Sequence, residues 1–300
     1  MKRTSLLLFP LVLLATGCGP RAPVPPPTME ELKNATFNGL DRGMISVTLT
    51  DGAWRGDTSG RKGLSTPRVA LEDDFILQAD IDSNGVMEAV VILTETFGGP
   101  ETYVYMAAVS KDNDSLVNPG TEMLGDRIQV RNIRMNGGIL QLDFIEQAPH
   151  DQVCCPGQLV TKNWELTPKG FVLQSLRSPG RLTPDVVSES EWALERWNIG
   201  QPVEKGAGVT LTYQEGRFVG SSGCNRYFAS VTTGQIPGAI AVGPVGGTRM
   251  TCPDSIMAIE SRFLRELAGV MNFGFHNTYL ALTTLRDSST STMLFRRKGS

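Results

Sequence analysis

SGCNRYF, at residues 222–228, decides the fold of the C-terminal part of this chain, together with TRMTCP at 248–253. One helical pattern follows these motifs, because apolar residues recur every three or four positions from Ile256 to Val270. Short β-rich segments lie on both sides of that pattern. Strands, then one helix, then further strands predict an α+β domain in which the helix lies across one face of a mainly antiparallel sheet.

The strands of this domain are predicted from β-branched and aromatic runs that are separated by turn residues. They are Val209–Tyr213, Arg217–Ser221, Tyr227–Thr232, Ala239–Val242, Phe273–Phe275, Tyr279–Thr284 and Thr292–Phe295. Asp254 or Ser255 can cap the start of the helix. We place the domain at residues 192–300, where it opens with Trp192.

These motifs, with Val242-Gly243-Pro244 and the helical Glu260, Phe263 and Leu264, closely resemble the META domain of the heat-shock protein HslJ family. The resemblance covers residues 192 to about 296, and the insertion Ile236-Pro237-Gly238 departs from the pattern. It implies a small α+β envelope domain that is linked to stress tolerance and has no agreed enzymatic activity.

Three polar residues of the motifs have two interpretations. Asn225, Arg226 and Arg249 can hydrogen-bond loop carbonyls and so shape the fold, or they can line a site for a ligand or protein partner. Gly223 is expected at a position where a side chain would clash or where the backbone angle requires glycine.

Residues 36–177 predict an all-β or β-rich domain, since no useful helical period occurs there. The predicted strands are Met44–Leu49, Phe75–Ala79, Ala89–Leu93, Thr102–Val109, Arg127–Ile133, Ile139–Phe144, Val160–Leu166 and Phe171–Leu176. Turns are expected at pairs such as Pro119-Gly120 and Asn136-Gly137, the latter within a hairpin. Residues 178–191 carry two prolines, a glycine and three acids, a composition that favours an interdomain linker.

An acidic loop interrupts the first domain. Asp80, Asp82, Asn84 and Glu88 place oxygen-bearing side chains at loop positions 1, 3, 5 and 9, with glycine at position 6. Calcium prefers six to eight oxygen ligands, and the backbone carbonyl of Val86 would supply another. The loop is similar to the nine-residue calcium loops of VCBS and FG-GAP repeats, and the alternative is a solvated polar turn.

The N-terminus has the layout of a bacterial lipoprotein signal at residues 1–17. Lys2 and Arg3 precede the apolar segment Leu6–Leu14, and small residues lead to Cys18. This arrangement resembles a lipobox, which implies that mature Cys18 carries acyl chains such as palmitate. Residues 18–35 would then form the lipidated cysteine, a proline-rich tether and a short helix that starts at a Thr28–Glu31 capping box.

Removing the signal leaves 26 basic against 31 acidic side chains. That balance argues against nucleic acid, because a nucleic-acid-binding face must neutralise phosphates. Four cysteines remain after Cys18 in a compartment that permits disulfides, and they allow three pairings. Proximity favours Cys224 with Cys252, which leaves Cys154 and Cys155 as a second set.

Catalytic signatures are scarce. The sequence has two histidines, His150 and His276, and no zincin, nucleophile-elbow, P-loop or Rossmann motif. Zinc is disfavoured, because no compact set of four nitrogen and sulfur ligands occurs. A thiol-dependent enzyme or redox protein that uses His150 with Cys154 or Cys155 is the catalytic alternative.

Taken together, the sequence predicts a non-catalytic lipoprotein of the bacterial outer membrane that faces the periplasm. It would act as a tethered binding or scaffold module for another envelope protein, and it would need no cofactor. Calcium-dependent adhesion through the loop from Asp80 to Glu88 is a third alternative.

Overall fold

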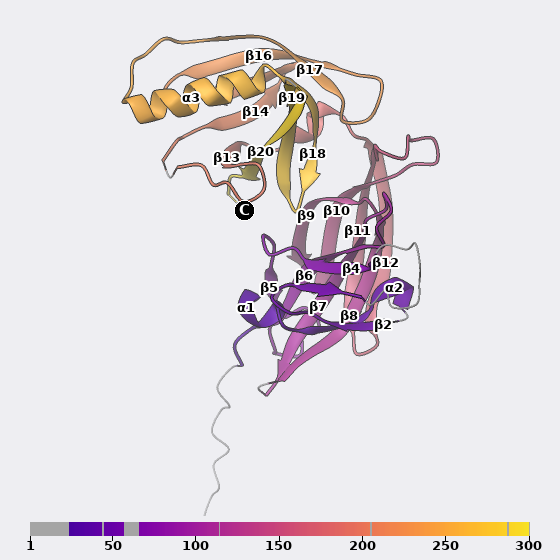
Figure 1. Ribbon diagram of the computed structural model, residues 1–300. Coiled ribbons are helices and arrows are strands. Elements are labelled where there is room, and N and C mark those ends of the chain that lie inside the picture. The colour runs from indigo at the N-terminus through magenta and orange to yellow at the C-terminus, as the bar shows by residue number, and fades with distance from the viewer. Residues whose placement is uncertain are drawn as a thin grey trace, which may run out of the picture.

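The computed structural model describes residues 24–43, 45–56, 66–113, 115–204, 206–286 and 288–299. Within these ranges no helix combines the length and apolar character that a membrane span requires. The predicted signal and Cys18 lie outside the described residues. Figure 1 shows a β-rich N-terminal part and a C-terminal sheet that carries the long helix α3.

A six-stranded antiparallel sheet forms the middle layer of the N-terminal part, in the order β3-β4-β6-β7-β8 with β5 paired to β6. Its strands are β3 (Ala53–Arg55), β4 (Arg68–Leu71), β5 (Leu77–Ala79), β6 (Glu88–Thr96), β7 (Tyr103–Asp112) and β8 (Ser115–Asp126). On β6, Val90 and Ile92 join one apolar cluster, whereas Ala89, Val91 and Leu93 join another. The strand is buried on both faces, and this explains its uninterrupted apolar sequence.

A four-stranded sheet in the order β12-β11-β10-β9 covers one face of the middle layer. Its strands are β9 (Gln129–Asn136), β10 (Ile139–Glu146), β11 (Gln158–Thr167) and β12 (Gly170–Arg181). Leu140, Leu142 and Phe144 of β10 contribute to the core between the sheets. The hairpin predicted between β9 and β10 is confirmed, because Asn136 pairs with Ile139 around a two-glycine turn.

Four short elements cover the opposite face of the middle layer. They are α1 (Met29–Leu32), β1 (Thr36–Gly39), α2 (Leu40–Gly43) and β2 (Ile45–Thr48). Leu32, Phe37 and Val47 supply apolar side chains to the second core. The capping box of α1 is confirmed, because the Thr28 hydroxyl accepts from the Glu31 N–H and the Glu31 carboxylate accepts from the Thr28 N–H.

An eight-stranded antiparallel sheet forms the C-terminal part, in the order β17-β16-β15-β14-β13-β20-β19-β18. Its strands are β13 (Trp192–Trp197), β14 (Thr210–Gln214), β15 (Arg217–Ser221), β16 (Arg226–Thr233), β17 (Ile240–Gly247), β18 (Val270–His276), β19 (Tyr279–Arg286) and β20 (Ser289–Arg297). Ala239 bridges to Asn272, and the Phe273 N–H donates to the Gly238 carbonyl at 2.8 Å. These bonds bring the first and last strands together, so the sheet nearly closes into a barrel.

Helix α3 (Asp254–Leu267) packs on this sheet through the predicted apolar stripe. The Phe263 ring lies 5.1 Å from the Tyr227 ring and 6.4 Å from the Phe295 ring, centre to centre. Pro253 occupies the N-cap position and makes no side-chain cap bond, so neither predicted capping residue serves as the cap. The α+β class predicted for this part and the β-rich class predicted for the first part are both confirmed.

The segment 178–191, predicted as an interdomain linker, is largely ordered and partly buried. β12 continues to Arg181, and the 3-10 helix η1 (Pro184–Val187) follows with Leu182, Val186 and Val187 buried in the C-terminal core. Pro184 opens η1 at a position where no backbone donor is needed, so proline marks the start of an element here.

Pro119-Gly120 likewise lies inside β8, not at the predicted turn between strands. The pairing of β8 with β7 shifts register near this point, which marks a bulge. The Asn118 side chain donates to the carbonyls of Ala108 and Gly120 at 2.7 and 2.9 Å. Its amide therefore supplies a donor at a bulge where proline has none.

Several contacts tie the two parts together. Ile145 and Leu159 of the N-terminal part belong to the C-terminal core. The Thr278 N–H donates to the Val130 carbonyl at 3.0 Å, which joins the β18–β19 turn to β9. In Figure 1 the tips of β18 and β19 meet β9 and β10 at this seam.

Candidate functional site

Glu260 lies at the centre of a buried hydrogen-bond network that connects α3 to the motif at 222–228. Its Oε2 accepts from the Ser222 hydroxyl and from the Asn225 N–H at 2.8 Å, and its Oε1 accepts from Asn225 Nδ2 at 2.9 Å. Burial alone would raise the pKa of this carboxyl, but the hydrogen bonds outweigh burial and the pKa is lowered. Glu260 is therefore held as a satisfied anion.

Asn225 connects this network to the second motif. Its Nδ2 also donates to the Met250 carbonyl at 3.2 Å, and its Oδ1 accepts from the Thr248 hydroxyl at 2.8 Å and the Met250 N–H at 2.6 Å. The amide thus uses both donors and both acceptor positions inside the protein. Of the two interpretations of Asn225, these contacts fit the one in which its side chain shapes the loops of the fold.

A disulfide fixes the two motifs beside this network. Cys224 and Cys252 are joined with an S–S distance of 2.07 Å and a Cα–Cα distance of 5.9 Å. This is the pairing that sequence proximity favours. Gly223 has a φ of +114°, and a Cβ atom there would lie 3.0 Å from the Ala207 carbonyl oxygen. Both the backbone angle and the close approach explain the glycine.

A groove of about 600 Å³ lies between α3 and the end of β17, and we call it the arginine groove. It is lined by Ser222, Asn225, Arg226, Tyr227, Val245, Gly246, Gly247, Thr248, Arg249, Met250, Thr251, Met257, Glu260 and Leu264. The structure therefore brings the three predicted partner-binding residues to one place. Arg226 and Arg249 are exposed, whereas Asn225 is buried.

The arginine groove combines positive charge with apolar surface. Among the described residues, neither the Arg226 nor the Arg249 guanidinium has an ion-pair partner within 4.0 Å. Met250 is 57 % exposed, and Phe228, whose ring lies over Gly246, is 51 % exposed. Exposed apolar side chains beside unpaired cations are typical of surfaces that bind protein segments.

The acidic loop between β5 and β6 also gathers its predicted residues. One carboxylate oxygen each from Asp80, Asp82 and Glu88 lies within 4.8 Å of the others. Backbone donors shape the turn, because the Gly85 N–H donates to Asp80 Oδ2 at 3.1 Å and the Val86 N–H donates to Asn84 Oδ1 at 2.7 Å.

Two carboxylates in this loop, those of Glu88 and Asp80, are only partly compensated by hydrogen bonds. Glu88 is 1 % exposed, and burial followed by the charges of Asp82 and Asp80 raises the pKa of its carboxyl. Asp80 Oδ1 is buried and has no hydrogen-bond partner among the described residues. An oxygen-binding divalent cation would fit this donor set and would relieve the mutual repulsion.

The loop that carries Cys154 and Cys155 is fixed by a buried acid. The two cysteines are joined to each other in a disulfide. Asp151 accepts from the backbone N–H groups of Ala148 at 2.8 Å and Gly157 at 2.9 Å, and it pairs with Arg181. His150 is exposed, and no contact joins it to either sulfur in this part of the described chain. Cys154 and Cys155 are thus in the disulfide form, and the alternative of a thiol-dependent enzyme or redox protein that uses them with His150 stays a prediction.

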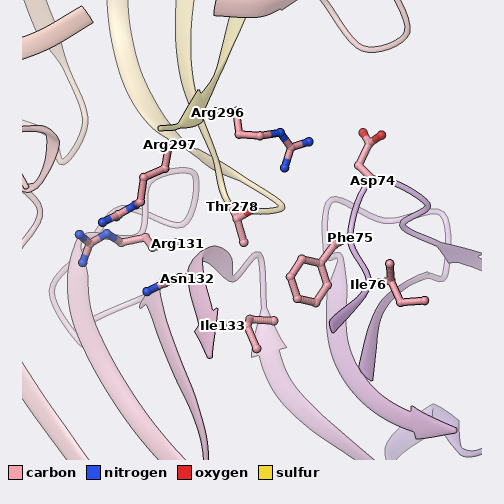
Figure 2. Close-up of a pocket in the computed structure, with 9 residues that line it drawn as sticks. All are labelled: Asp74, Phe75, Ile76, Arg131, Asn132, Ile133, Thr278, Arg296 and Arg297. Atoms are coloured by element: carbon pink, nitrogen blue, oxygen red, sulfur yellow. The ribbon is translucent and has the colours of Figure 1, made fainter. Parts of the chain in front are cut away.

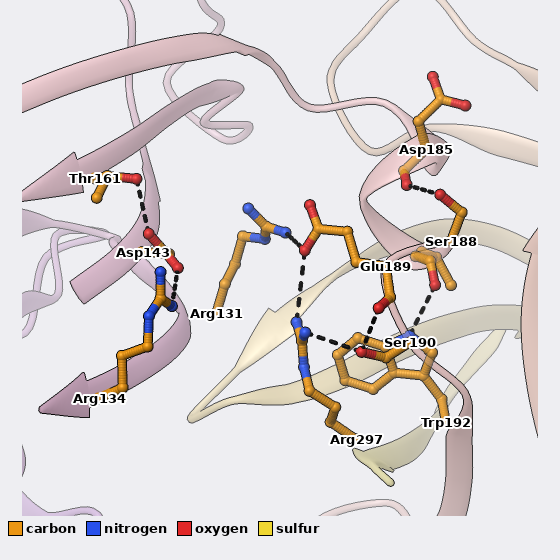
Figure 3. Close-up of polar contacts among 11 residues, drawn as sticks. Arg131, Arg134, Asp143, Thr161, Asp185, Ser188, Glu189, Ser190, Trp192 and Arg297 are labelled. Atoms are coloured by element: carbon orange, nitrogen blue, oxygen red, sulfur yellow. Dashed lines mark hydrogen bonds and ion pairs between the residues drawn. The ribbon is translucent and has the colours of Figure 1, made fainter. Parts of the chain in front are cut away.

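Sequence reasoning missed an arginine cluster at the seam between the two parts. Figure 3 shows the Glu189 carboxylate between Arg131, at 3.0 Å, and Arg297, at 3.7 Å. Arg131 stands at a buried position of β9, where the strand pattern predicts an apolar residue. That mismatch between pattern and residue type is the signal that could have found the cluster.

Comparisons with known proteins bear on the C-terminal part. Residues 185–300 match the META domain family. No curated protein matches the chain. An NMR structure of a protein from Burkholderia xenovorans is 24 % identical, covers 42 % of this chain and 96 % of that chain, and has a TM-score of 0.31. A second NMR structure is 22 % identical, with coverages of 38 % and 94 % and a TM-score of 0.30. The C-terminal part of this chain, residues 185–300, is a META domain.

Proposed function

We propose that this protein is a non-catalytic envelope lipoprotein whose META domain binds an acidic, partly apolar protein segment in the arginine groove. The proposal rests on the different environments of the polar residues in the motifs, since some are buried and hydrogen-bonded and others are exposed. Asn225 and Glu260 bond to each other and to the backbone, while Arg226 and Arg249 lie exposed and without ion-pair partners among the described residues. The buried residues build the groove, and the exposed residues are left to bind.

Charge favours an acidic partner. The Glu260 carboxylate lines the groove, but its oxygens accept hydrogen bonds from Ser222 and Asn225, so it offers little repulsion to a second anion. The two guanidiniums can form charge-assisted hydrogen bonds with carboxylates of the partner. Pro244 lies on β17, an end strand of the sheet, and proline there disfavours addition of a partner strand. Side chains rather than backbone pairing would therefore hold the partner.

The chemistry of the remaining groups supports binding rather than catalysis. The four described cysteines are in disulfides, and His150 lies exposed on a loop. The META family is linked to stress tolerance, so the bound partner would belong to an envelope stress response. The signal layout that ends at Cys18 supports a lipid anchor at the outer membrane, facing the periplasm.

The length of the proline-rich segment after Cys18 supports tethering as well. Pro27 is held on the body of the protein, because its carbonyl accepts from Gln78 Nε2 at 2.9 Å. The proline-rich residues between Cys18 and Pro27 would then span the distance from the membrane. Replacing Cys18 with serine should release the protein from the membrane fraction of its host, whereas unchanged membrane retention would contradict the anchor.

The groove is tested with the full mature chain and a fluorescein-labelled peptide of alternating glutamate and leucine. We expect saturable, salt-sensitive binding that weakens at least about tenfold in the double variant R226E/R249E. Arg217→Glu, on the exposed surface of β15, is the matched control and should leave the affinity unchanged. Equal binding of a lysine–leucine peptide, or equal affinity in the double variant, would refute the proposal.

A second candidate function is calcium-dependent stabilisation or adhesion. It is favoured by the buried carboxylate of Glu88 and by Asp80 Oδ1, which is buried and has no hydrogen-bond partner among the described residues. Calcium should raise the melting temperature of the mature chain, and Asp80→Ala should abolish that increase. Affinity is expected in the sub-millimolar to millimolar range of extracellular modules. A calorimetric titration that shows no heat up to several millimolar calcium would exclude the site.

A further inference from the structure

A cavity of about 240 Å³ lies at the seam between the two parts, and we call it the seam pocket. Two stretches of the N-terminal part and two of the META domain build it together, as Figure 2 shows. Its lining consists of Asp74, Phe75, Ile76, Arg131, Asn132, Ile133, Thr278, Arg296 and Arg297. Neither the arginine groove nor the acidic loop contributes a residue to it.

The charges that line the seam pocket do not balance. Three arginines and one acid, Asp74, line it, and the two Asp74 oxygens already accept from Arg196 at 2.6 and 2.8 Å. Arg296 is paired with Glu195 at 2.9 Å, which leaves Arg131 and Arg297 as the charges that face the pocket with a shared partner. In Figure 2 the Arg131 and Arg297 guanidiniums lie next to each other, away from Asp74. One carboxylate, that of Glu189, contacts both of them.

Arg131 is fixed and incompletely satisfied. It is 7 % exposed, and its buried Nε has no hydrogen-bond partner among the described residues. The guanidinium lies over the Phe275 ring at 5.2 Å, and that of Arg297 lies over the Trp192 ring at 5.0 Å. Burial and the nearby charge of Arg131 lower the pKa of Arg297. Two guanidiniums held on aromatic faces form a preorganised site for an anion.

We propose that the seam pocket binds a small oxyanion, a carboxylate or a phosphate-type group, at the Arg131 and Arg297 guanidiniums, alongside Glu189, which does not line the pocket. The planar guanidinium matches these groups in bidentate geometry. Phe75 and Ile133 give the pocket an apolar wall, so a compact organic acid fits it better than a polymer. Because both parts of the chain supply residues, the bound anion also links the META domain to the N-terminal sheets.

The test uses the full mature chain with inorganic phosphate, sulfate and succinate as separate probes, in chloride buffer of constant ionic strength. We expect saturable heat in calorimetry and a rise in melting temperature with at least one probe. Arg131→Lys should weaken that binding at least about tenfold, because a lysine ammonium cannot form the bidentate hydrogen bonds that a planar guanidinium makes with an oxyanion. Arg134→Lys is the matched control, because Arg134 lies on the same strand, is half exposed and pairs with Asp143 at 2.6 Å.

Arg297→Lys provides a second variant if Arg131→Lys perturbs folding, with circular dichroism as the check on structure. The anion should bind equally well to R226E/R249E, so a failure of the arginine groove leaves this result unaffected. Absence of saturable binding by all three probes overturns the inference. Equal binding in both seam variants, or equal loss in Arg134→Lys, overturns it as well.

Discussion

Two buried glutamates show how the same side chain acquires opposite roles from its neighbours. Glu260 receives hydrogen bonds from Ser222 and Asn225, and its pKa is lowered. Glu88 receives the Ile81 N–H at 2.8 Å but faces the charges of Asp82 and Asp80, and its pKa is raised. The first glutamate stabilises the fold as an anion, whereas the ionised form of the second destabilises it.

Glu260→Gln should destabilise the protein by about 2 kcal/mol at pH 7, because hydrogen bonds to a buried anion are replaced by weaker ones. The folded pKa lies below the ordinary value of 4.5. The stability that the charge contributes is therefore fully present above pH 4.5 and is lost as the pH falls through the folded pKa. Urea unfolding of both proteins from pH 7 to pH 3 measures this, with the exposed Asp254→Asn as control. A constant difference across this range would contradict the role assigned to Glu260.

Glu88→Gln should have the opposite effect when a chelator is present. The folded pKa is raised above 4.5, so the ionised form is penalised at neutral pH and the penalty disappears as the pH falls through the folded pKa. The variant should therefore melt higher than the natural protein at pH 8 and equally near pH 4.5. Added calcium should reverse the order at pH 8, and an unchanged order with calcium would argue against a cation site.

At the scale of elements, the two disulfides should contribute very differently. Cys224–Cys252 closes a loop with a sequence separation of 28, for which the chain-entropy model gives about 3.5 kcal/mol. Cys154–Cys155 joins neighbours, and the same model gives about 1 kcal/mol.

Paired serine substitutions, made separately at the two disulfides, test this difference by chemical denaturation. The change at 224 and 252 should lower the free energy of unfolding by roughly two to four times as much as the change at 154 and 155. Equal losses would show that the 222–253 region is not held by its cross-link.

Much of the element pattern could be predicted from the sequence, since β6 and α3 carry strong periodic signals. The misses have physical causes. Pro119 is tolerated because a bulge and the Asn118 amide replace its missing donor. The segment 178–191 looked like a linker, yet Val186 and Val187 are buried by a partner sheet that local sequence does not reveal. Tertiary contacts overrode local composition in both places.

At the scale of the whole molecule, shared core residues and hydrogen bonds join the META domain to the N-terminal sheets, and we expect the two parts to unfold together. Ile145 and Leu159 lie in the C-terminal core, and Asn277 Nδ2 donates to Glu72 at 2.6 Å across the seam. The grouping of Arg226 with Arg249 could be predicted, because each lies in one of the two motifs that define the domain. The seam pocket could not, because its residues come from segments far apart in the sequence and meet only in the folded chain.

Asp74→Asn should lower the free energy of unfolding by about 1–3 kcal/mol, because it removes a bidentate bond to Arg196 and leaves that charge partly buried. The adjacent Asp73→Asn is the control. Asp73 makes an exposed pair with Lys33, which should be worth less than about 1 kcal/mol. Calorimetry should show one unfolding transition in the natural protein, and two separate transitions would contradict the coupling.

The central claim is that the META motifs build a groove from which Arg226 and Arg249 bind an acidic segment of an envelope protein. A photo-crosslinking amino acid in place of the exposed Met250, which lines the groove, tests this most directly in the anchored protein in its native host, with position 217 as the control. We predict a position-250 crosslink to an acidic stretch, identified by mass spectrometry and lost in Arg226→Glu. Identical products from both positions, or a product that persists in the variant, would contradict it.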